Sequence, residues 1–182
     1  MIVSEAALGR LRSWEAEVGI VLGSGLNALV SESQESVAYS EFAGLPKPSV
    51  PGHVDRFVLG NVGSKRVIFA QGRVHLYEGH TARQVTAGIR TLAAAGIKRL
   101  ILTNAAGVVN ERFSPGAWMM ITDHLNLTGT TPLLGSADFV EMTETYSKRW
   151  RAEFAGAAKT QNIILHEGVY ARMSRPAIRN AG

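Results

Sequence analysis

The sequence VGIVLGSGLN, at residues 18–27, decides the fold because an apolar run breaks there into a glycine turn. Residues 18–22 are predicted to form a buried strand, since the run is short and bounded by a turn signal. A glycine turn after a strand lets backbone N–H groups approach an anion, and the Ser24 hydroxyl adds a donor. The turn lacks the third glycine of a dinucleotide fingerprint and the lysine of a P-loop. Alone, it is typical of any α/β protein.

A second apolar run, 67–70, is followed by GRVHLYEGH at 72–80. In an extended chain, residues two apart lie on one face, so Arg73, His75 and Tyr77 could converge on one small anionic, hydroxyl-rich ligand. The Arg fork matches phosphate oxygens, His supplies a proton or a donor, and Tyr supplies a flat amphipathic wall. On these residues alone, a polar loop with three unrelated side chains is an equal alternative.

A third apolar run, 99–103, ends in small residues that again allow close approach of the backbone to a ligand. Helical and strand patterns alternate along the chain, which predicts an α/β sandwich with a mostly parallel sheet. Trp118 is expected in its core. Helices are predicted over 4–17, from the capping box at 81–84 to Gly96, and over 144–159. Strands 55–61 and 65–71 are predicted to form a hairpin around a three-residue loop, and further strands are predicted at 98–103, 117–122 and 163–171. Residues 127–138 are predicted to form a loop.

Composition narrows the class of protein. The chain has 182 residues, of which 46% are hydrophobic and 19% charged, and this predicts one globular domain over 1–182. No apolar run is long enough to span a membrane, and 1–14 contain no signal-peptide core. Cys is absent, which excludes disulfides and thiolate metal sites, and no His, Asp or Glu set has metal-ligand spacing. We therefore expect a cytoplasmic protein without a metal.

The net charge of +4 is unevenly distributed. Residues 1–147 carry 12 basic and 13 acidic side chains, whereas 148–182 carry 7 basic and 2 acidic ones. The basic end has few aromatic side chains for base stacking. We expect no nucleic-acid partner.

Five short motifs occur in order along the chain: GSGL at 23–26, PGH at 51–53, GRVHLYEG at 72–79, TNAAG at 103–107 and DHLN at 123–126. Together they resemble the trimeric purine nucleoside phosphorylases, in the family that also contains methylthioadenosine phosphorylase. The resemblance runs from about Gly19 to Tyr170. It implies a three-layer α/β sandwich of the nucleoside phosphorylase type with a mixed, mostly parallel central sheet.

The resemblance also implies an activity and a site. Inorganic phosphate, a co-substrate and not a cofactor, would cleave purine nucleosides of the inosine and guanosine class to free base and pentose 1-phosphate, the pentosyl transfer of purine salvage. Glu78 would order the loop between Arg73 and Tyr77. The matching positions are Ser24, Arg73, His75 and the Ala105 N–H for phosphate, His53 and Asn104 near it, and Tyr77 and a neighbouring subunit's Phe139 for the sugar.

Phe139 therefore implies a cyclic homotrimer, in which one subunit completes its neighbour's site. The family usually has an Arg before this Phe and a Pro after it, but here Asp138 and Val140 stand there. An ordinary loop aromatic that covers the core is a nearly equal alternative.

The end of the chain departs from the family. After 167–170 the family continues into Gly-Pro-x-[Tyr/Phe]-Glu-Thr, whose Glu grips the purine, whereas Arg179 stands at that position here. We expect no base-binding residue and an incomplete domain. One possible coding string for 174–182, read one base later, gives Pro-Gly-Pro-Gln-Tyr-Glu-Thr-Pro. Residues 171–182 are therefore interpreted as an aberrant, frameshifted tail.

Three other functions remain open from the sequence. Methylthioadenosine phosphorylase is the alternative within the family, and a non-catalytic remnant is the alternative outside enzymes. A dinucleotide binder ranks last, because Glu41 follows no convincing strand at the place where such proteins carry an acidic residue.

Overall fold

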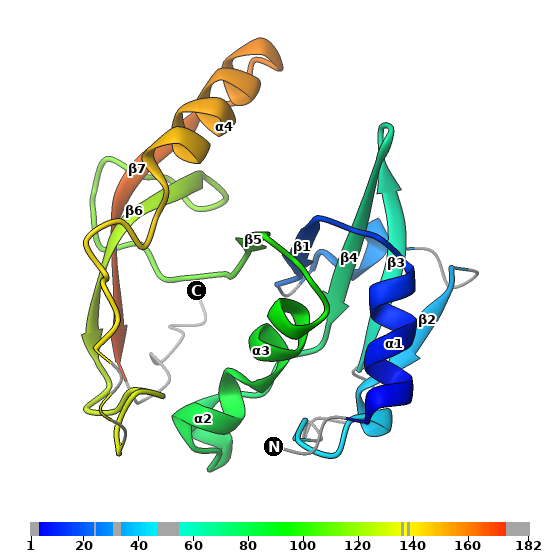
Figure 1. The fold of residues 1–182 in the computed structure, drawn as a ribbon. Helices are drawn as coiled ribbons and strands as arrows, with labels where there is room; N and C mark the ends of the chain where they lie inside the picture. The colour runs from blue at the N-terminus through cyan, green and yellow to red at the C-terminus, as the bar shows by residue number, and fades with distance from the viewer. Residues whose placement is uncertain are drawn as a thin grey trace. The chain divides into compact units, whose positions relative to one another are not determined.

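The fold is taken from a computed structural model, which describes residues 4–23, 25–30, 34–46, 55–135, 137 and 139–173 (Figure 1). The chain divides into two compact units, Met1–Ala105 and Ala106–Gly182, and each is described by itself. The expectation of a single domain over 1–182 concerns how these units combine and stays a prediction.

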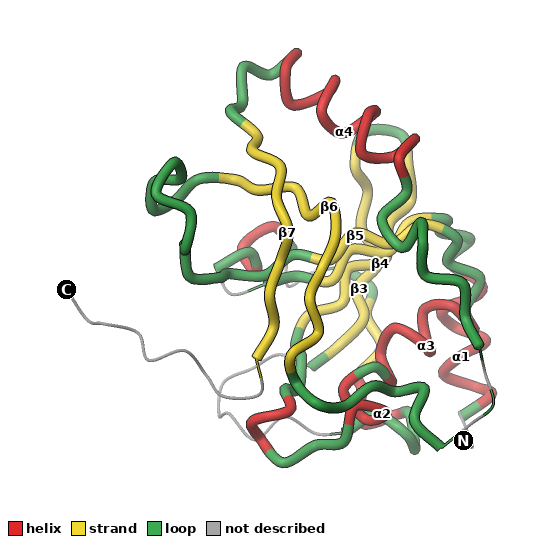
Figure 2. Tube along the Cα trace, turned by 90° about the vertical axis from the view of Figure 1, so that its left-hand side faces the viewer, coloured by secondary structure: helices red, strands yellow, loops and turns green. Residues whose placement is uncertain are grey.

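The first unit is built on a five-stranded mixed sheet in the order β2-β3-β4-β1-β5. Strand β1 pairs in parallel with both β4 and β5, while β3 runs antiparallel to β2 and β4. The strands, drawn yellow in Figure 2, are β1 (Val18–Val21), β2 (Ser36–Ala38), β3 (Arg56–Val62), β4 (Lys65–Gln71) and β5 (Arg99–Leu102). The helices are α1 (Glu5–Ser13), α2 (Ala82–Val85) and α3 (Ala87–Ala94), with 3-10 turns η1 (Asn27–Leu29), η2 (Tyr39–Glu41) and η3 (Leu76–Glu78).

The second unit pairs β6 (Trp118–Leu127) in parallel with β7 (Leu165–Met173), and α4 (Lys148–Thr160) lies between them in sequence. Within the described residues, three of the five strand pairings are parallel. The five-stranded sheet itself has two parallel and two antiparallel pairings, so the expected mixed sheet is confirmed.

Both faces of strand β4 are buried. Ile68 and Ala70 of β4 join a core with α1 and α3, whereas Val67 and Phe69 belong to a separate cluster. This alternation follows from the two-residue repeat of a strand. A strand buried on both faces needs a continuous apolar run, which is why the sequence patterns located β1 and β4.

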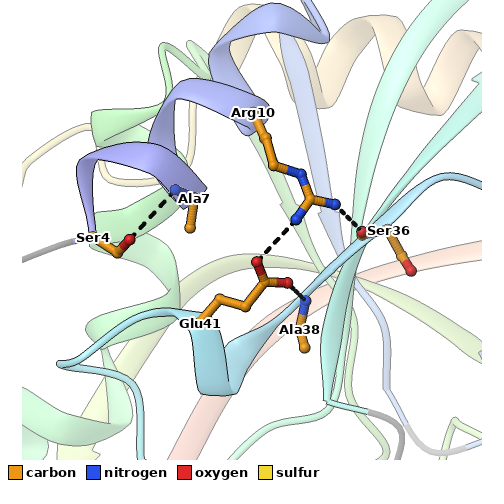
Figure 3. Close-up of polar contacts among 6 residues, drawn as sticks. All are labelled: Ser4, Ala7, Arg10, Ser36, Ala38 and Glu41. Carbon is orange, nitrogen blue, oxygen red and sulfur yellow. Dashed lines mark hydrogen bonds and ion pairs between the residues drawn. The ribbon is translucent and has the colours of Figure 1, made fainter.

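Helix α1 begins at the Ser4 cap, whose Oγ accepts the Ala7 N–H at 3.5 Å. Arg10 links this helix to the sheet: Nη1 contacts Glu41 Oε2 at 2.9 Å, and Nη2 donates to the Ser36 carbonyl at 2.8 Å (Figure 3). The ion pair is largely exposed, so its role is to set the position of α1 and its contribution to stability is small.

Two expectations for the first unit are corrected. The hairpin loop has two residues and not three, because Val62 pairs with Lys65 and continues the ladder. The capping box at Thr81 is present, with its Oγ1 accepting the Gln84 N–H at 3.2 Å, but the helix breaks at Thr86 into α2 and α3. The Thr86 hydroxyl donates back to the Ala82 carbonyl at 3.0 Å, a contact that competes with helix continuation.

The bounds in the second unit also differ from expectation. Strand β6 continues to Leu127, well past residue 122, because β7 pairs with it along its length up to Met173. Helix α4 starts at Lys148, since Ser147 is the cap and accepts the Trp150 N–H at 3.4 Å.

Little of the second unit is buried. Of the residues from 106 onward that the structure describes, Ala158 is the only buried apolar one. Trp118 is 56% exposed, so the expectation of a core tryptophan was wrong. Other large apolar side chains of this unit, among them Leu127 and Ile164, are also exposed.

Candidate functional site

Three turns follow neighbouring parallel strands at one edge of the sheet. Val21 of β1 lies in register with Ala70 of β4 and with Leu102 of β5. The residues after these three strand ends therefore emerge at the same carboxyl edge, where ligands bind in open α/β sheets.

Hydrogen bonds join the three turns. The Gly23 N–H, after β1, donates to Thr103 Oγ1 at 2.7 Å, and that hydroxyl donates to the Val21 carbonyl at 2.9 Å. Arg73 Nη1, after β4, donates to the Thr103 carbonyl at 2.8 Å. The Arg73 guanidinium, which follows β4, is thus held against the backbone that leads from β5 into Ala105.

Gly23 is a glycine because backbone passes directly beside it. A Cβ there would lie 2.9 Å from the Thr103 carbonyl oxygen and 3.1 Å from the Asn104 Cα. The turn then closes with a bond from the Leu26 N–H to the Gly23 carbonyl at 3.2 Å, and Gly25 has φ 87°. The first glycine permits close approach of strands, and the second permits the left-handed turn conformation.

Gly23→Ala is expected to lower the free energy of unfolding by about 1–3 kcal/mol, because the added methyl would overlap backbone that cannot move aside cheaply. Urea unfolding followed by circular dichroism measures it. Gly9→Ala is the matched control: a Cβ at that helical position meets nothing within 4 Å, so stability should rise by about 0.5–1 kcal/mol. Equal stability of Gly23→Ala and the parent would contradict the close contact.

The extended conformation predicted across Arg73, His75 and Tyr77 is present only in part. His75 is extended, but Leu76–Glu78 form the 3-10 turn η3. The turn forms because Glu78 Oε1 accepts the His75 N–H at 2.7 Å, and Gly79, with φ 88°, ends it. The His75 and Tyr77 rings still stack, with centroids 4.8 Å apart and planes 11° from parallel. Glu78 thus orders this segment.

Tyr39 makes a hydrogen bond to the segment that leads into Arg73 at this same edge of the sheet. Its side chain is buried, and its hydroxyl donates to the Gly72 carbonyl at 3.2 Å, directly before Arg73. Burial raises the pKa of the Tyr39 phenol well above its usual range, the Asp55 charge raises it further, and the Arg73 charge opposes the shift. The phenol therefore stays protonated in the folded protein.

Stability should consequently fall at high pH. Above about pH 10 the unfolded chain loses the Tyr39 proton while the folded chain keeps it, so the free energy of unfolding decreases by about 1.4 kcal/mol per pH unit for this group. Below that pH the contribution is fully present. Urea unfolding between pH 8 and 11, taken as about the accessible range, should show a shallower decline in Tyr39→Phe than in the parent. Parallel declines in the two proteins would contradict the burial of a protonated phenol.

The remaining predicted site residues fall in different places. Asn104 and Ala105 are exposed at the end of β5, and Asn104 Nδ2 donates to the Ala105 carbonyl at 3.2 Å. Ser24, His53 and Arg179 lie outside the described residues. Phe139, in the second unit, is 98% exposed and so covers no core.

Sequence reasoning missed two residues of this site, Thr103 and Tyr39. Thr103 is a polar residue at the end of an apolar run, which was a usable signal. Tyr39 carried none, because its hydrogen bond to Gly72 joins positions distant in sequence.

The geometry argues against a dinucleotide site. A strand does precede Glu41, contrary to expectation, but β2 is antiparallel to β3 and lies at the far edge of the sheet from β1. Glu41 is also bound to Arg10. In a dinucleotide-binding fold the acidic residue follows a parallel strand beside β1.

The described residues contain neither a candidate metal cluster nor a helix able to span a membrane. No group of three or more His, Cys, Asp or Glu side chains there is placed to hold a metal ion. No helix in the same residues has the length and apolar character needed to cross a membrane.

Comparison with known proteins defines the class. The profile of the Phosphorylase superfamily matches residues 17–178, and the chain belongs to that superfamily. Within it, the similarity is to purine nucleoside phosphorylases. The chain is 40% identical over 169 residues to purine nucleoside phosphorylase 1 of Geobacillus stearothermophilus, covering 88% of this chain and 62% of that protein. It is 38% identical over 163 residues to the purine nucleoside phosphorylase of Mycobacterium leprae, covering 88% and 59%.

Solved structures give the same result. A purine nucleoside phosphorylase in complex with ribose-1-phosphate matches with a TM-score of 0.85 and 28% identity over 94% of this chain and 68% of that one. The Schistosoma mansoni enzyme in complex with inosine matches with a TM-score of 0.83 and 26% identity, covering 94% and 67%. The nucleoside phosphorylase fold is confirmed. The chain spans about 60% of the length of the curated relatives it matches.

Proposed function

We propose that this protein catalyses phosphorolysis of purine nucleosides of the inosine and guanosine class. Inorganic phosphate attacks the anomeric carbon, the bond to the purine breaks, and free base and pentose 1-phosphate leave. The observation that carries the proposal is the convergence at one sheet edge of Gly23, Arg73 and Thr103, joined by bonds of 2.7 and 2.8 Å. The relatives named as purine nucleoside phosphorylases support the choice of substrate.

The reaction needs a dianion fixed beneath a sugar that gains oxocarbenium character. Preorganised charge and positioning supply most of the acceleration in such a site. Arg73 provides the charge, and the Ser24 hydroxyl and the Ala105 N–H are proposed as neutral donors. Roles near the phosphate are proposed for His75, His53 and Asn104. The Tyr77 ring, stacked on His75, forms a wall for the sugar. Phosphate is a co-substrate, and we propose no further cofactor.

The test is an assay of base release from inosine and guanosine with and without phosphate. Release that requires phosphate supports the proposal. Release from methylthioadenosine alone would replace it with the sister activity, which the named relatives do not favour.

A second candidate is a remnant that binds phosphate without turnover. The observation in its favour is the second unit, where Ala158 alone is buried among the described apolar residues. In the same assay, a folded chain that binds phosphate but releases no base would identify this candidate.

We also propose a cytoplasmic homotrimer that acts in purine salvage, without a nucleic-acid partner. Phe139 is 98% exposed in its own chain, which suits a side chain that reaches the sugar site of a neighbouring copy. Analytical ultracentrifugation tests the assembly: a monomer with full turnover would contradict it.

A further inference from the structure

We infer that Thr103 is the positioning residue of the phosphate site, a clamp that holds three turns in one arrangement. The inference rests on the proposed function for the identity of the ligand. Thr103 itself is assigned no contact with phosphate, and its effect is exerted through Gly23 and Arg73.

The side chain of Thr103 connects β5 with the glycine turn after β1. Its Oγ1 accepts the Gly23 N–H at 2.7 Å and donates to the Val21 carbonyl at 2.9 Å, so both hydrogen-bonding roles of the hydroxyl are used. Gly23 is a buried residue, so loss of this acceptor would leave its N–H without a hydrogen bond at a cost in stability. The hydroxyl therefore fixes the start of the turn that carries Ser24.

The main chain of Thr103 connects β5 with the turn after β4. Its N–H donates to the Val21 carbonyl at 3.1 Å, and its carbonyl accepts Arg73 Nη1 at 2.8 Å. That same carbonyl oxygen is the atom a Cβ on Gly23 would approach to 2.9 Å. One residue thus sets the position of the guanidinium relative to the glycine turn and to the Ala105 N–H that follows.

The test compares Thr103→Val with Thr103→Ser. Valine keeps the shape and the carbonyl but removes the hydroxyl, whereas serine retains the hydroxyl. Thr91→Val is the matched control, because the buried Thr91 hydroxyl also donates to a backbone carbonyl, that of Ala87 at 3.1 Å, but lies in α3. Thr103→Val should bind inorganic phosphate roughly tenfold more weakly, with Thr103→Ser and Thr91→Val within about twofold of the parent.

Titration with phosphate and urea unfolding are measured on all four proteins. Equal loss of stability in the two valine variants, with loss of affinity in Thr103→Val alone, separates positioning from a merely structural role. Unchanged affinity in Thr103→Val, an equal loss in Thr91→Val, or no rescue by serine would overturn the inference.

A second readout keeps the test independent of the ligand. The Gly23 amide proton should exchange slowly with solvent in the parent and in Thr103→Ser, and fast in Thr103→Val, as followed by NMR. If none of the four proteins binds phosphate, the proposed function fails. The exchange rate of the Gly23 amide proton then decides alone whether Thr103 holds the turns together. A Gly23 amide equally protected in Thr103→Val would overturn it.

Discussion

Arg73→Ala is expected to weaken the binding of inorganic phosphate by about 100-fold or more. Hydrogen bonds to a charged group contribute about 1.5–3 kcal/mol each, and a bidentate guanidinium makes two of them. Arg73 is held at the sheet edge by its bond to the Thr103 carbonyl at 2.8 Å, so its geometry is set before the ligand arrives. Isothermal titration with phosphate at constant ionic strength measures the loss.

Two variants separate geometry from charge. Arg73→Lys keeps the charge but loses the planar fork, so an intermediate loss is expected. Arg83→Ala removes an exposed arginine of α2 from the same unit and changes net charge equally. Phosphate affinity that falls as much in Arg83→Ala as in Arg73→Ala would mean that binding reflects net charge and not this site.

Phe57→Ala is expected to lower the free energy of unfolding by about 3–5 kcal/mol. The ring is fully buried and contacts Tyr39, with centroids 4.6 Å apart. It also lies perpendicular to the Phe42 ring, with centroids 5.6 Å apart. Removing it leaves a cavity beside the ring of Tyr39, whose hydroxyl donates to the Gly72 carbonyl. Urea unfolding, followed by the fluorescence of the buried Trp14, measures the loss.

Phe139→Ala provides the matched control for the single chain, because it deletes the same side chain where it is 98% exposed within that chain. The two variants are compared at protein concentrations at which ultracentrifugation shows a monomer. The stability of Phe139→Ala should change by no more than about 0.5 kcal/mol. If Phe57→Ala lowered the free energy of unfolding by as little as this, the cluster of Tyr39, Phe42 and Phe57 would not be the core of the first unit.

The sequence allowed prediction of the features that depend on local pattern. Apolar runs marked β1, β4 and β5, and their parallel arrangement brought the turns after them to one edge. The capping box at Thr81 likewise marked a true helix start. In each case the physical cause lies within a few residues, so a single sequence contains it.

Other features depend on contacts between distant residues. The Thr103 hydroxyl accepts the N–H of Gly23, which lies 80 positions away in the sequence. The length of β6 follows from its pairing with β7. The turn η3 depends on Glu78 capping His75, which the two-residue repeat of an extended chain does not anticipate. The roles of Ser24 and His53 stay predictions, because these residues lie outside the described part of the chain.

The most direct measurement is an NMR titration of the chain with inorganic phosphate, with chloride at equal ionic strength as reference. If one oxyanion sits between the turns, the Ala105 amide and the Arg73 Nε–H should shift together and saturate with a single affinity. Shifts confined to the basic residues of α4, at Lys148, Arg149 and Arg151, with Ala105 and Arg73 unmoved, would contradict the account.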